Sequence, residues 1–311
     1  MKIQELAFAK VNLHLDVLNK RDDGYHDIGT IFQTINIHDV LEFELIDDLG
    51  IQIECDSEVT DNPEDNLIYK AAMSLKSYAK SQGISSVLME TKGVRISVEK
   101  SLPMGAGLGG GSADAAATLR GLNKLWSLAL SFSILEKLGT PLGADVPFMI
   151  QGGTAIAEGI GERLRPVQPP SGFHVLIVTP SDFVSTAAAY SELVPRGANE
   201  FQKFIEQYEC SINKSEKDLR GESAFLDKLY FNHFEKTVFK KHPQIEKLKI
   251  WMSKQGAVKS LMSGSGASVF GLFKDKADAE SAYDAVSSVF PGLRYKKVTS
   301  FEKNHLEAES Q

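Results

Sequence analysis

The chain has 311 residues, of which 42% are hydrophobic and 24% are charged, and its formal net charge is −7. This length and composition predict a globular protein with two domains. No basic cluster is present, which excludes nucleic acid as a partner, and no apolar run is long enough to cross a bilayer.

The amino terminus and the cysteines indicate the compartment. Residues 1–7 lack the apolar core of a signal peptide, so a cytoplasmic protein is predicted. The two cysteines, Cys55 and Cys210, lie in no C-x-x-C pair and near no histidine cluster, so no metal site is expected. Two reduced thiols are favoured, although a disulfide between them stays open. We expect a small-molecule substrate, with no membrane partner and no obligate protein partner.

Repeated alternation of apolar and polar residues marks the first 55 positions, as at Val11, Leu13, Leu15 and Val17. Alternation of this kind predicts short strands joined by turns. The run Asp22-Asp-Gly24 is a turn signal, and a tyrosine and a histidine follow it directly. A helix is predicted over 66–82, where apolar residues recur at helical spacing.

Five glycines fall within seven positions between Gly105 and Gly111. An alternating segment, Val94–Glu99, predicts a strand before them, and the run from Ser112 to Asn123 predicts a helix after them. Strand, glycine loop and helix start together form a phosphate-binding arrangement, because the first helical N–H groups lack partners and glycine lets an anion approach closely. Ser112 is expected to be the N-cap of this helix or a hydroxyl ligand.

Several known glycine loops can be compared with this one. The P-loop requires a lysine after the glycines, and protein kinases require H-R-D and D-F-G tripeptides, which the chain lacks. The dinucleotide pattern G-x-G-x-x-G fits at Gly105, Gly107 and Gly110. That pattern also calls for a fully buried strand before it and an acidic residue about 20 positions on, and neither is found. A glycine-rich turn without a ligand is the remaining alternative.

The second half of the chain mixes strands and helices in an order that favours an α+β fold. A short helix is predicted over 131–138, a glycine-rich region over 139–161 and a domain boundary in the proline-rich segment 166–172. A buried strand is predicted over 174–178, a solvated helix and loop over 196–223, a helix over 232–255, a small-residue loop that ends in a strand over 260–270, and a disordered tail over 303–311.

Three segments in this order resemble the GHMP kinase family. Pro103–Ser112 resembles its phosphate loop, Ser263–Ala267 its third motif and Ala9–Leu13 its first motif. The resemblance implies a ribosomal-protein-S5-like domain over 1–165, a ferredoxin-like α/β sandwich over 166–302 and an active site in the cleft between them. It also implies that ATP is bound by Pro103, Met104, Gly105, Ala106, Gly107, Leu108, Gly109, Gly110, Gly111, Ser112 and Ala113.

Three further motifs, Asp23–His26, Thr30–Gln33 and Gly143–Phe148, resemble one branch of that family. For this branch the resemblance implies transfer of the γ-phosphoryl group of ATP, with Mg²⁺, to a tertiary hydroxyl of a diphosphocytidyl methylerythritol in the non-mevalonate isoprenoid pathway. Two departures are small: Ala113 replaces a common serine and Ser265 a common threonine. Residues 196–225 match nothing in the family and receive no role.

Lys10 and Asp145 are the expected catalytic residues. Phosphoryl transfer depends on positioning and charge stabilisation more than on covalent chemistry. Asp145 can accept the hydroxyl proton and Lys10 can neutralise developing charge, although a nearby cation makes a carboxylate a weaker base. Asp145 is therefore expected to orient the hydroxyl and accept its proton late. Without the motifs, Asp145 would read as a turn residue and Lys10 as a surface lysine.

The cytosine of such a substrate requires a flat slot and hydrogen bonds at its edge. Tyr25 is expected to stack on the base, with Tyr190 as the opposite wall, and His26 to read its edge. By resemblance, the pocket is also lined by Asn12, Phe32 and Thr186. His14 alternates with Leu13 and Leu15 and is expected to border the site, whereas structural or solvated roles are expected for His38, His174, His233, His242 and His305.

Three other functions stay open at this stage. The chain could be a different GHMP kinase, acting on a sugar, homoserine or mevalonate, although these substrates carry no base for Tyr25 and His26. It could be a dinucleotide-dependent oxidoreductase that uses the same glycines. It could also be a nucleotide-binding protein without activity, but the presence of both Lys10 and Asp145 weighs against that.

Overall fold

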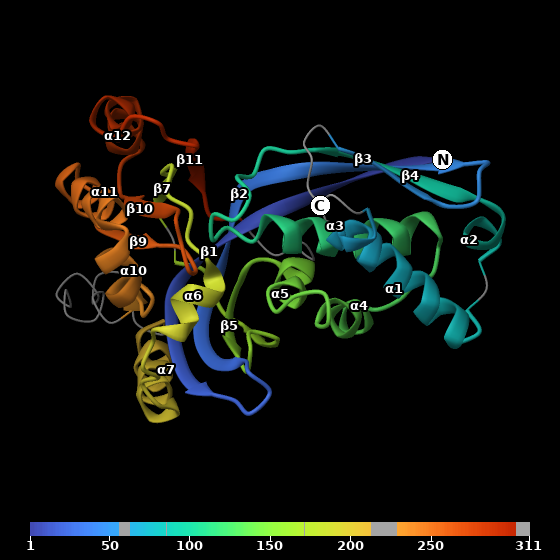
Figure 1. Ribbon diagram of the computed structural model, residues 1–311, viewed down its shortest axis with the longest axis horizontal. Coiled ribbons are helices and arrows are strands. Elements are labelled where there is room, and N and C mark those ends of the chain that lie inside the picture. The colour runs from blue at the N-terminus through green and yellow to red at the C-terminus, as the bar shows by residue number, and fades with distance from the viewer. Residues whose placement is uncertain (56–62, 85, 171, 213–228, 303–311) are drawn as a thin grey trace.

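The computed structural model describes residues 1–55, 63–84, 86–170, 172–212 and 229–302, with only the backbone of 209–212. Two sheets, both mainly antiparallel, and the helices that pack on them form the fold (Figure 1). The α+β prediction is therefore confirmed. None of the described helices is both long and apolar enough to cross a membrane.

The first sheet has seven strands in the order β3-β4-β2-β1-β8, with β5 paired to β2 and β6 paired to β5. Its strands are β1 (Lys2–Lys20), β2 (His26–Ile46), β3 (Ile51–Cys55), β4 (Gly93–Glu99), β5 (Thr154–Glu158), β6 (Arg163–Pro166) and β8 (Phe231–Asn232). Most neighbouring strands are antiparallel. Within the described part of the chain, β4 pairs only with β2, which is antiparallel to it, and with β3, which is parallel but comes earlier in the chain. A dinucleotide-binding unit requires a strand after the glycine-loop helix that pairs in parallel with the strand before the loop, so this topology contradicts that alternative.

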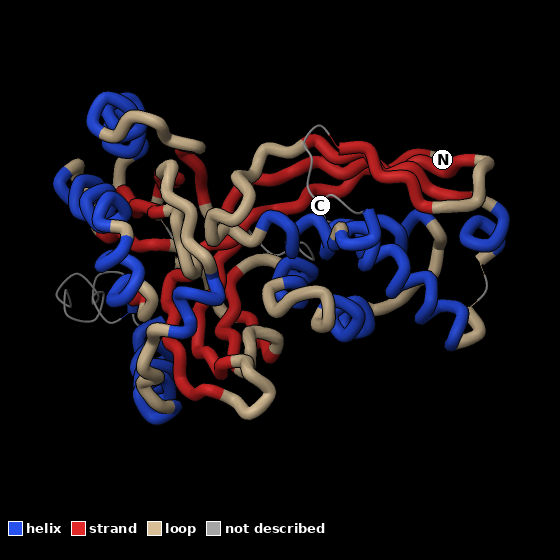
Figure 2. Tube along the Cα trace, viewed as in Figure 1, coloured by secondary structure: helices blue, strands red, loops and turns tan. Residues whose placement is uncertain are grey.

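β1 and β2 are long, curved strands that run through the centre of the molecule (Figures 1 and 2), so the prediction of short strands is wrong. Their pairing shifts register at three places, between Phe8 and Lys10, between Asn12 and His14, and between Val17 and Asn19. A β-bulge changes which face a side chain occupies without ending the strand. The broken alternation in the sequence therefore marks bulges rather than strand ends.

Five helices accompany the first sheet: α1 (Leu67–Ser81), α2 (Val87–Thr91), α3 (Gly110–Leu125), α4 (Phe132–Gly139) and α5 (Val146–Gln151). The single turn η1 (Pro63–Asp65) precedes α1, and the Asn66 side chain caps α1 by accepting from the Ile68 N–H at 2.9 Å. Alanines 113, 115, 116 and 117 of α3 are buried in the core, where this helix packs on β1, β2, α1 and α5. Their small size lets this helix approach the strands closely. The predicted helices over 66–82 and 131–138 are confirmed to within one residue.

The second sheet is antiparallel, with the order β11-β7-β10-β9. It consists of β7 (His174–Thr179), β9 (Lys259–Met262), β10 (Val269–Phe273) and β11 (Tyr295–Ser300), and α10 (Glu235–Lys241), α11 (Pro243–Lys254) and α12 (Lys276–Val289) pack on one face. This order and its crossing helices have the ferredoxin-like pattern. The other face packs on the first sheet, so β7 is buried on both sides, as its continuous apolar run predicted.

Two sequence predictions for this half need correction. The helix expected over 232–255 is divided, because Pro243 disfavours a helical conformation at His242, and α11 starts afresh there. Residues 198–212 form α7 (Ala198–Ile212), which is not solvated on all sides: it buries Phe201, Phe204, Ile205 and Tyr208 against the first sheet. Residues 213–228, the tail 303–311 and the side chain of Cys210 lie outside the described residues.

The domain limits 1–165 and 166–302 stay a prediction. β6 ends in the first sheet at Pro166 and β7 begins the second at His174, in agreement with a boundary in between. However, β8 returns to pair with β1 in parallel at Leu15 and Asn232, so the carboxyl-terminal half also completes the first sheet.

Candidate active site

A cavity of about 910 Å³ lies where β1, β2, the glycine loop, the start of α5 and α6 (Thr186–Ser191) meet. Its volume is within the usual range for ligand sites. Most of the predicted site residues line it: Lys10, Asn12, Tyr25, His26, Phe32, Gly105, Ala106, Gly107, Gly109, Gly110, Gly111, Ser112, Asp145, Thr186 and Tyr190. Four do not, namely Pro103, Met104, Leu108 and Ala113; Leu108 and Ala113 are core residues.

The glycine loop between β4 and α3 is held by hydrogen bonds from two segments that are distant in the sequence. β1 donates to it, since the Lys10 N–H bonds the Leu108 carbonyl at 3.0 Å. The small-residue loop after β9 bonds it twice, from Ser268 N–H to the Ala106 carbonyl at 3.1 Å and from the Ser263 hydroxyl to the Gly107 carbonyl at 2.8 Å. The third motif therefore supports the shape of the loop.

The loop requires glycine at particular positions. A Cβ at Gly107, where φ is +78°, would lie 2.1 Å from the Ser263 carbonyl oxygen. Gly109 has φ of +74° and is the N-cap residue of α3, which begins at Gly110. Ser112 therefore lies in the first turn of the helix and is not the N-cap. Its hydroxyl stays a candidate ligand, because the N-terminus of α3 opens on the cavity.

Gly109 and Gly110 provide a matched test of the loop. Gly109→Ala is expected to raise the KM for ATP and to lower stability by about 1–2 kcal/mol, because alanine is disfavoured in the left-handed region. Gly110 is helical, and a Cβ there would lie 3.5 Å from the Cβ of Leu102, which is ordinary contact. Gly110→Ala should therefore fold normally and change KM less. Steady-state kinetics and thermal melts of both variants check this; equal KM values would contradict it.

Lys10 and Asp145 meet at the centre of the cavity. The Lys10 Nζ lies 3.3 Å from Asp145 Oδ2. Lys10 is only 4% exposed, so it is not a surface lysine. Asp145 is the N-cap residue of α5, but its side chain makes no capping hydrogen bond. Neither the surface-lysine nor the turn-residue interpretation accounts for this ion pair.

Two further predicted residues surround the lysine. The Asn12 Oδ1 accepts from Lys10 Nζ at 2.8 Å, and the ammonium lies 5.2 Å from the centroid of the Phe32 ring. The cation–π contact and the amide oxygen compensate for removing the ammonium from water. Lys10 is thus held in one place, directed at the carboxylate.

Aromatic side chains gather at the other end of the cavity. The rings of His26 and Tyr190 stack on each other, with centroids 4.9 Å apart and planes inclined by 24°. Tyr25 also lines the cavity and is 60% exposed; that it faces Tyr190 across a slot for the base stays a prediction. Partial burial and the nearby Lys20 ammonium lower the pKa of His26, which keeps its ring neutral at pH 7, with one donor and one acceptor nitrogen.

Sequence reasoning missed Phe183, which also lines the cavity and is 68% exposed. A Cβ on Gly105 would lie 3.1 Å from its ring, so Phe183 approaches the glycine loop. The only sequence signal for it was an aromatic residue in the segment just before α6. Thr186, the first residue of that helix, bonds Ser265 of the third motif at 2.8 Å.

A buried ion triad behind the loop was also missed. Lys100 lies between Asp39 and Asp114, with its Nζ 2.5 Å and 2.7 Å from their carboxylates. Asp39 also accepts from the N–H groups of Ser101 and Leu102. Burial, opposed in part by Lys100, raises the pKa of Asp114 to about 7. The triad fixes both ends of the glycine loop, but no local motif indicates it.

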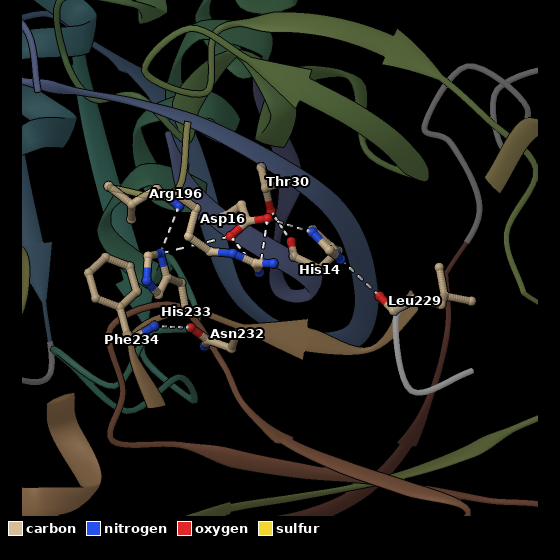
Figure 3. Close-up of polar contacts among 9 residues, drawn as sticks. His14, Asp16, Thr30, Arg196, Leu229, Asn232, His233 and Phe234 are labelled. Atoms are coloured by element: carbon tan, nitrogen blue, oxygen red, sulfur yellow. Dashed lines mark hydrogen bonds and ion pairs between the residues drawn. The ribbon is translucent and has the colours of Figure 1, made fainter. Parts of the chain in front are cut away.

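His14 does not border the cavity, contrary to the sequence prediction. The bulge between Asn12 and His14 shifts the alternation, so Leu15 lines the cavity in its place. The His14 ring instead stacks on Phe204 of α7, with centroids 3.8 Å apart. Figure 3 shows it beside Asp16.

Asp16 is the centre of a buried polar cluster (Figure 3). Arg196 Nη1 lies 3.1 Å from its Oδ1, and the nearest ring nitrogens of His14 and His233 lie 3.5 Å and 3.8 Å from its carboxylate oxygens. Burial lowers the pKa of His233, and its Nδ1 accepts from Val17 N–H at 3.4 Å. The cluster joins β1 to segments 180 or more residues away in the chain, so His233 has the structural role predicted for it.

The remaining histidines were predicted to be structural or solvated. His38 packs edge-on against Phe8, and His242 lies 3.2 Å from Asp182 at the break between α10 and α11. His174 is the partly buried first residue of β7. None of these three lines the cavity, whereas His305 lies outside the described residues.

Comparison with known proteins gives matches over nearly the whole chain. Sequence models of the GHMP kinases N-terminal domain and C-terminal domain match residues 66–153 and 216–292. A 4-diphosphocytidyl-2-C-methyl-D-erythritol kinase of Thermodesulfovibrio yellowstonii is 40% identical over 279 residues, which cover 89% of this chain and 91% of that protein.

Solved structures agree with this. A crystal structure of 4-(cytidine 5'-diphospho)-2C-methyl-D-erythritol kinase is 31% identical, with a TM-score of 0.71, and the match covers 96% of this chain and 99% of that one. A homoserine kinase from Cytophaga hutchinsonii has a TM-score of 0.72 but is only 19% identical, with 97% and 95% covered. The second likeness concerns the fold alone.

Proposed function

The chain belongs to the GHMP kinase family, and we propose that it transfers the γ-phosphoryl group of ATP to the 2-hydroxyl of 4-diphosphocytidyl-2-C-methyl-D-erythritol. The observation that carries this is the cavity itself, which joins a glycine loop, an ion pair between the buried Lys10 and Asp145, and a group of aromatic rings. The glycine loop is suited to the phosphates of the donor, the Lys10–Asp145 pair to the reacting hydroxyl, and the aromatic rings to the base. The product, a 2-phosphate, belongs to the non-mevalonate route to isoprenoid precursors.

The reacting groups can be assigned to atoms. The substrate hydroxyl oxygen forms the new bond to the γ-phosphorus, the bond from that phosphorus to the bridging oxygen breaks, and ADP leaves with the electron pair. Asp145 receives the hydroxyl proton. Lys10, held by Asn12 at 2.8 Å and by Asp145 at 3.3 Å, stabilises negative charge on the transferring group.

Nucleotide phosphates would lie at the glycine loop and the N-terminus of α3. The described residues contain no group of three or more His, Cys, Asp or Glu side chains that could hold a metal ion. Mg²⁺ would therefore be held mainly by the phosphates, as is usual for this ion, with the Ser112 hydroxyl and the Asp145 carboxylate as candidate protein ligands on the cavity wall. Bound Mg²⁺ would neutralise phosphate charge.

Two exposed aromatic residues at the cavity, Tyr25 and Phe183, are suited to hold the cytosine. Both rings line the cavity and neither is covered by protein. His26, neutral and fixed against Tyr190, offers a donor and an acceptor to the edge of the base. A sugar, homoserine or mevalonate has no flat ring to place there, which disfavours the other members of the family as functional models.

Losing Tyr25 or His26 should affect the base-containing substrate selectively. Tyr25→Ala is expected to lower kcat/KM by roughly tenfold to a hundredfold, because stacking on a base is worth about 1–3 kcal/mol. His26→Ala should act in the same direction through the lost edge contacts. The measurement is ADP release with the full substrate and with a fragment that lacks cytosine.

The KM for ATP is the internal control, because the glycine loop is separate from these side chains. Equal losses on the full substrate and the fragment would remove Tyr25 and His26 from cytosine recognition. Absence of ADP release by the unaltered enzyme with the full substrate, but release with mevalonate or homoserine, would reassign the substrate within the family.

A further inference from the structure

A line of hydrogen bonds runs from the Lys10 ammonium into the sheet beneath the cavity. Lys10 Nζ donates to Asn12 Oδ1 at 2.8 Å, Asn12 Nδ2 donates to the Thr30 hydroxyl at 2.9 Å, and that hydroxyl donates to the His14 carbonyl at 2.5 Å. Figure 3 shows the last of these contacts. Exposed fractions are 4% for Lys10, 2% for Asn12 and 0% for Thr30, so the line is desolvated throughout.

Each hydrogen bond in this line can have only one donor and acceptor assignment. An ammonium can only donate, so Asn12 must present its carbonyl oxygen to Lys10. The amide nitrogen then faces Thr30 and needs an acceptor there. The Thr30 oxygen is available as that acceptor because its own proton goes to His14. Lys10 at one end of the amide and Thr30 at the other therefore stabilise the same one of its two possible orientations.

The alternation of side chains along β2 explains why Thr30 lies at this place. Asn12 pairs with Phe32 on β2, and Thr30 is two residues before Phe32, so it shares the face of that ring. Phe32 and Ile28 line the cavity on either side of it, whereas Thr30 itself lies below Asn12 and does not reach the cavity. Solvent therefore cannot replace its hydroxyl.

We propose that Thr30 is a positioning residue, which fixes the Asn12 amide and through it the Lys10 ammonium against Asp145. Without the hydroxyl, the Asn12 amide nitrogen has no acceptor, and a buried unpaired donor is costly. Rotation of the amide would relieve this, but would bring its N–H₂ group against the ammonium. The catalytic consequence rests on the proposed function, whereas the amide orientation does not.

The kinetic test compares Thr30→Val, which keeps the shape, with Thr30→Ser, which keeps the hydroxyl. Thr30→Val should lower kcat by about tenfold to a hundredfold with little change in the KM for ATP, and Thr30→Ser should retain most of the activity. Thr34→Val is the matched control, because Thr34 is a buried threonine of the same strand whose hydroxyl has no hydrogen-bond partner among the described residues. It should behave as the unaltered enzyme.

A double-mutant cycle tests whether Thr30 acts through Asn12. In the Asn12→Ala background, Thr30→Val should lower kcat by less than about twofold, since coupled residues are not additive. A full, multiplicative loss in that background would overturn the proposal. Activity of Thr30→Val equal to that of Thr34→Val would also overturn it.

Exchange of the Asn12 side-chain amide protons, followed by NMR, separates this inference from the proposed reaction. Slow exchange is expected in the unaltered protein and in Thr30→Ser, and fast exchange in Thr30→Val. Rapid exchange in the unaltered protein would overturn the proposal even if Thr30→Val failed to fold. Absence of turnover with slow exchange would instead count against the proposed substrate and leave the positioning role supported.

Discussion

Asp145→Asn is expected to reduce turnover by about 10²–10⁴-fold, the usual contribution of a general acid–base group. Asparagine has the same shape but cannot take up the hydroxyl proton, and it removes the charge that faces Lys10 at 3.3 Å. The fold should be kept, because the Asp145 side chain makes no capping bond to α5. Single-turnover rates of ADP formation, with ATP binding measured by calorimetry, check this.

Asp284→Asn is a matched control for that variant, since Asp284 is an exposed residue of α12 outside the cavity. It should leave both rate and binding unchanged. Turnover of Asp145→Asn at the level of this control would remove Asp145 from the mechanism. Loss of ATP binding together with turnover would instead indicate that the carboxylate shapes the nucleotide site.

Lys10→Met is expected to lower kcat by about 10²–10³-fold, the size of effect seen when one fixed electrostatic stabiliser is removed. Methionine fills similar space beside Phe32 but provides no charge for the transferring group. It also leaves the Asn12 oxygen without its 2.8 Å donor and Asp145 without its counter-ion. The loss should fall mainly on kcat, because the glycine loop still provides the phosphate contacts.

Lys276→Met serves as the control, because Lys276 pairs with Glu280 on the surface of α12. Steady-state kinetics and thermal melts should be run on both variants. If Lys10→Met raised the KM for ATP and left kcat unchanged, the lysine would be a binding residue and not a stabiliser of the transition state.

The local sequence was sufficient to predict the glycine loop of the site and the helix that follows it. The glycine run was interpretable because the need for a left-handed backbone at Gly105, Gly107 and Gly109 is a property of single residues. The helix that follows was equally local: the predicted run starts at Ser112, two residues after the observed start at Gly110, and the N-cap is Gly109 instead of Ser112. Lys10 and Asp145 were found through motifs, and the structure brings them together across 135 positions of sequence.

Tertiary structure alone decided the rest. Periodicity shows which side chains alternate, but a bulge depends on the pairing of β1 with β2, and it moved Leu15 into the cavity and His14 onto α7. The burial of one face of α7, the stacking of His26 on Tyr190 and the approach of Phe183 to the glycine loop likewise join segments far apart in the chain. Such contacts have no local signature, because their free energy comes from surfaces that meet only after folding.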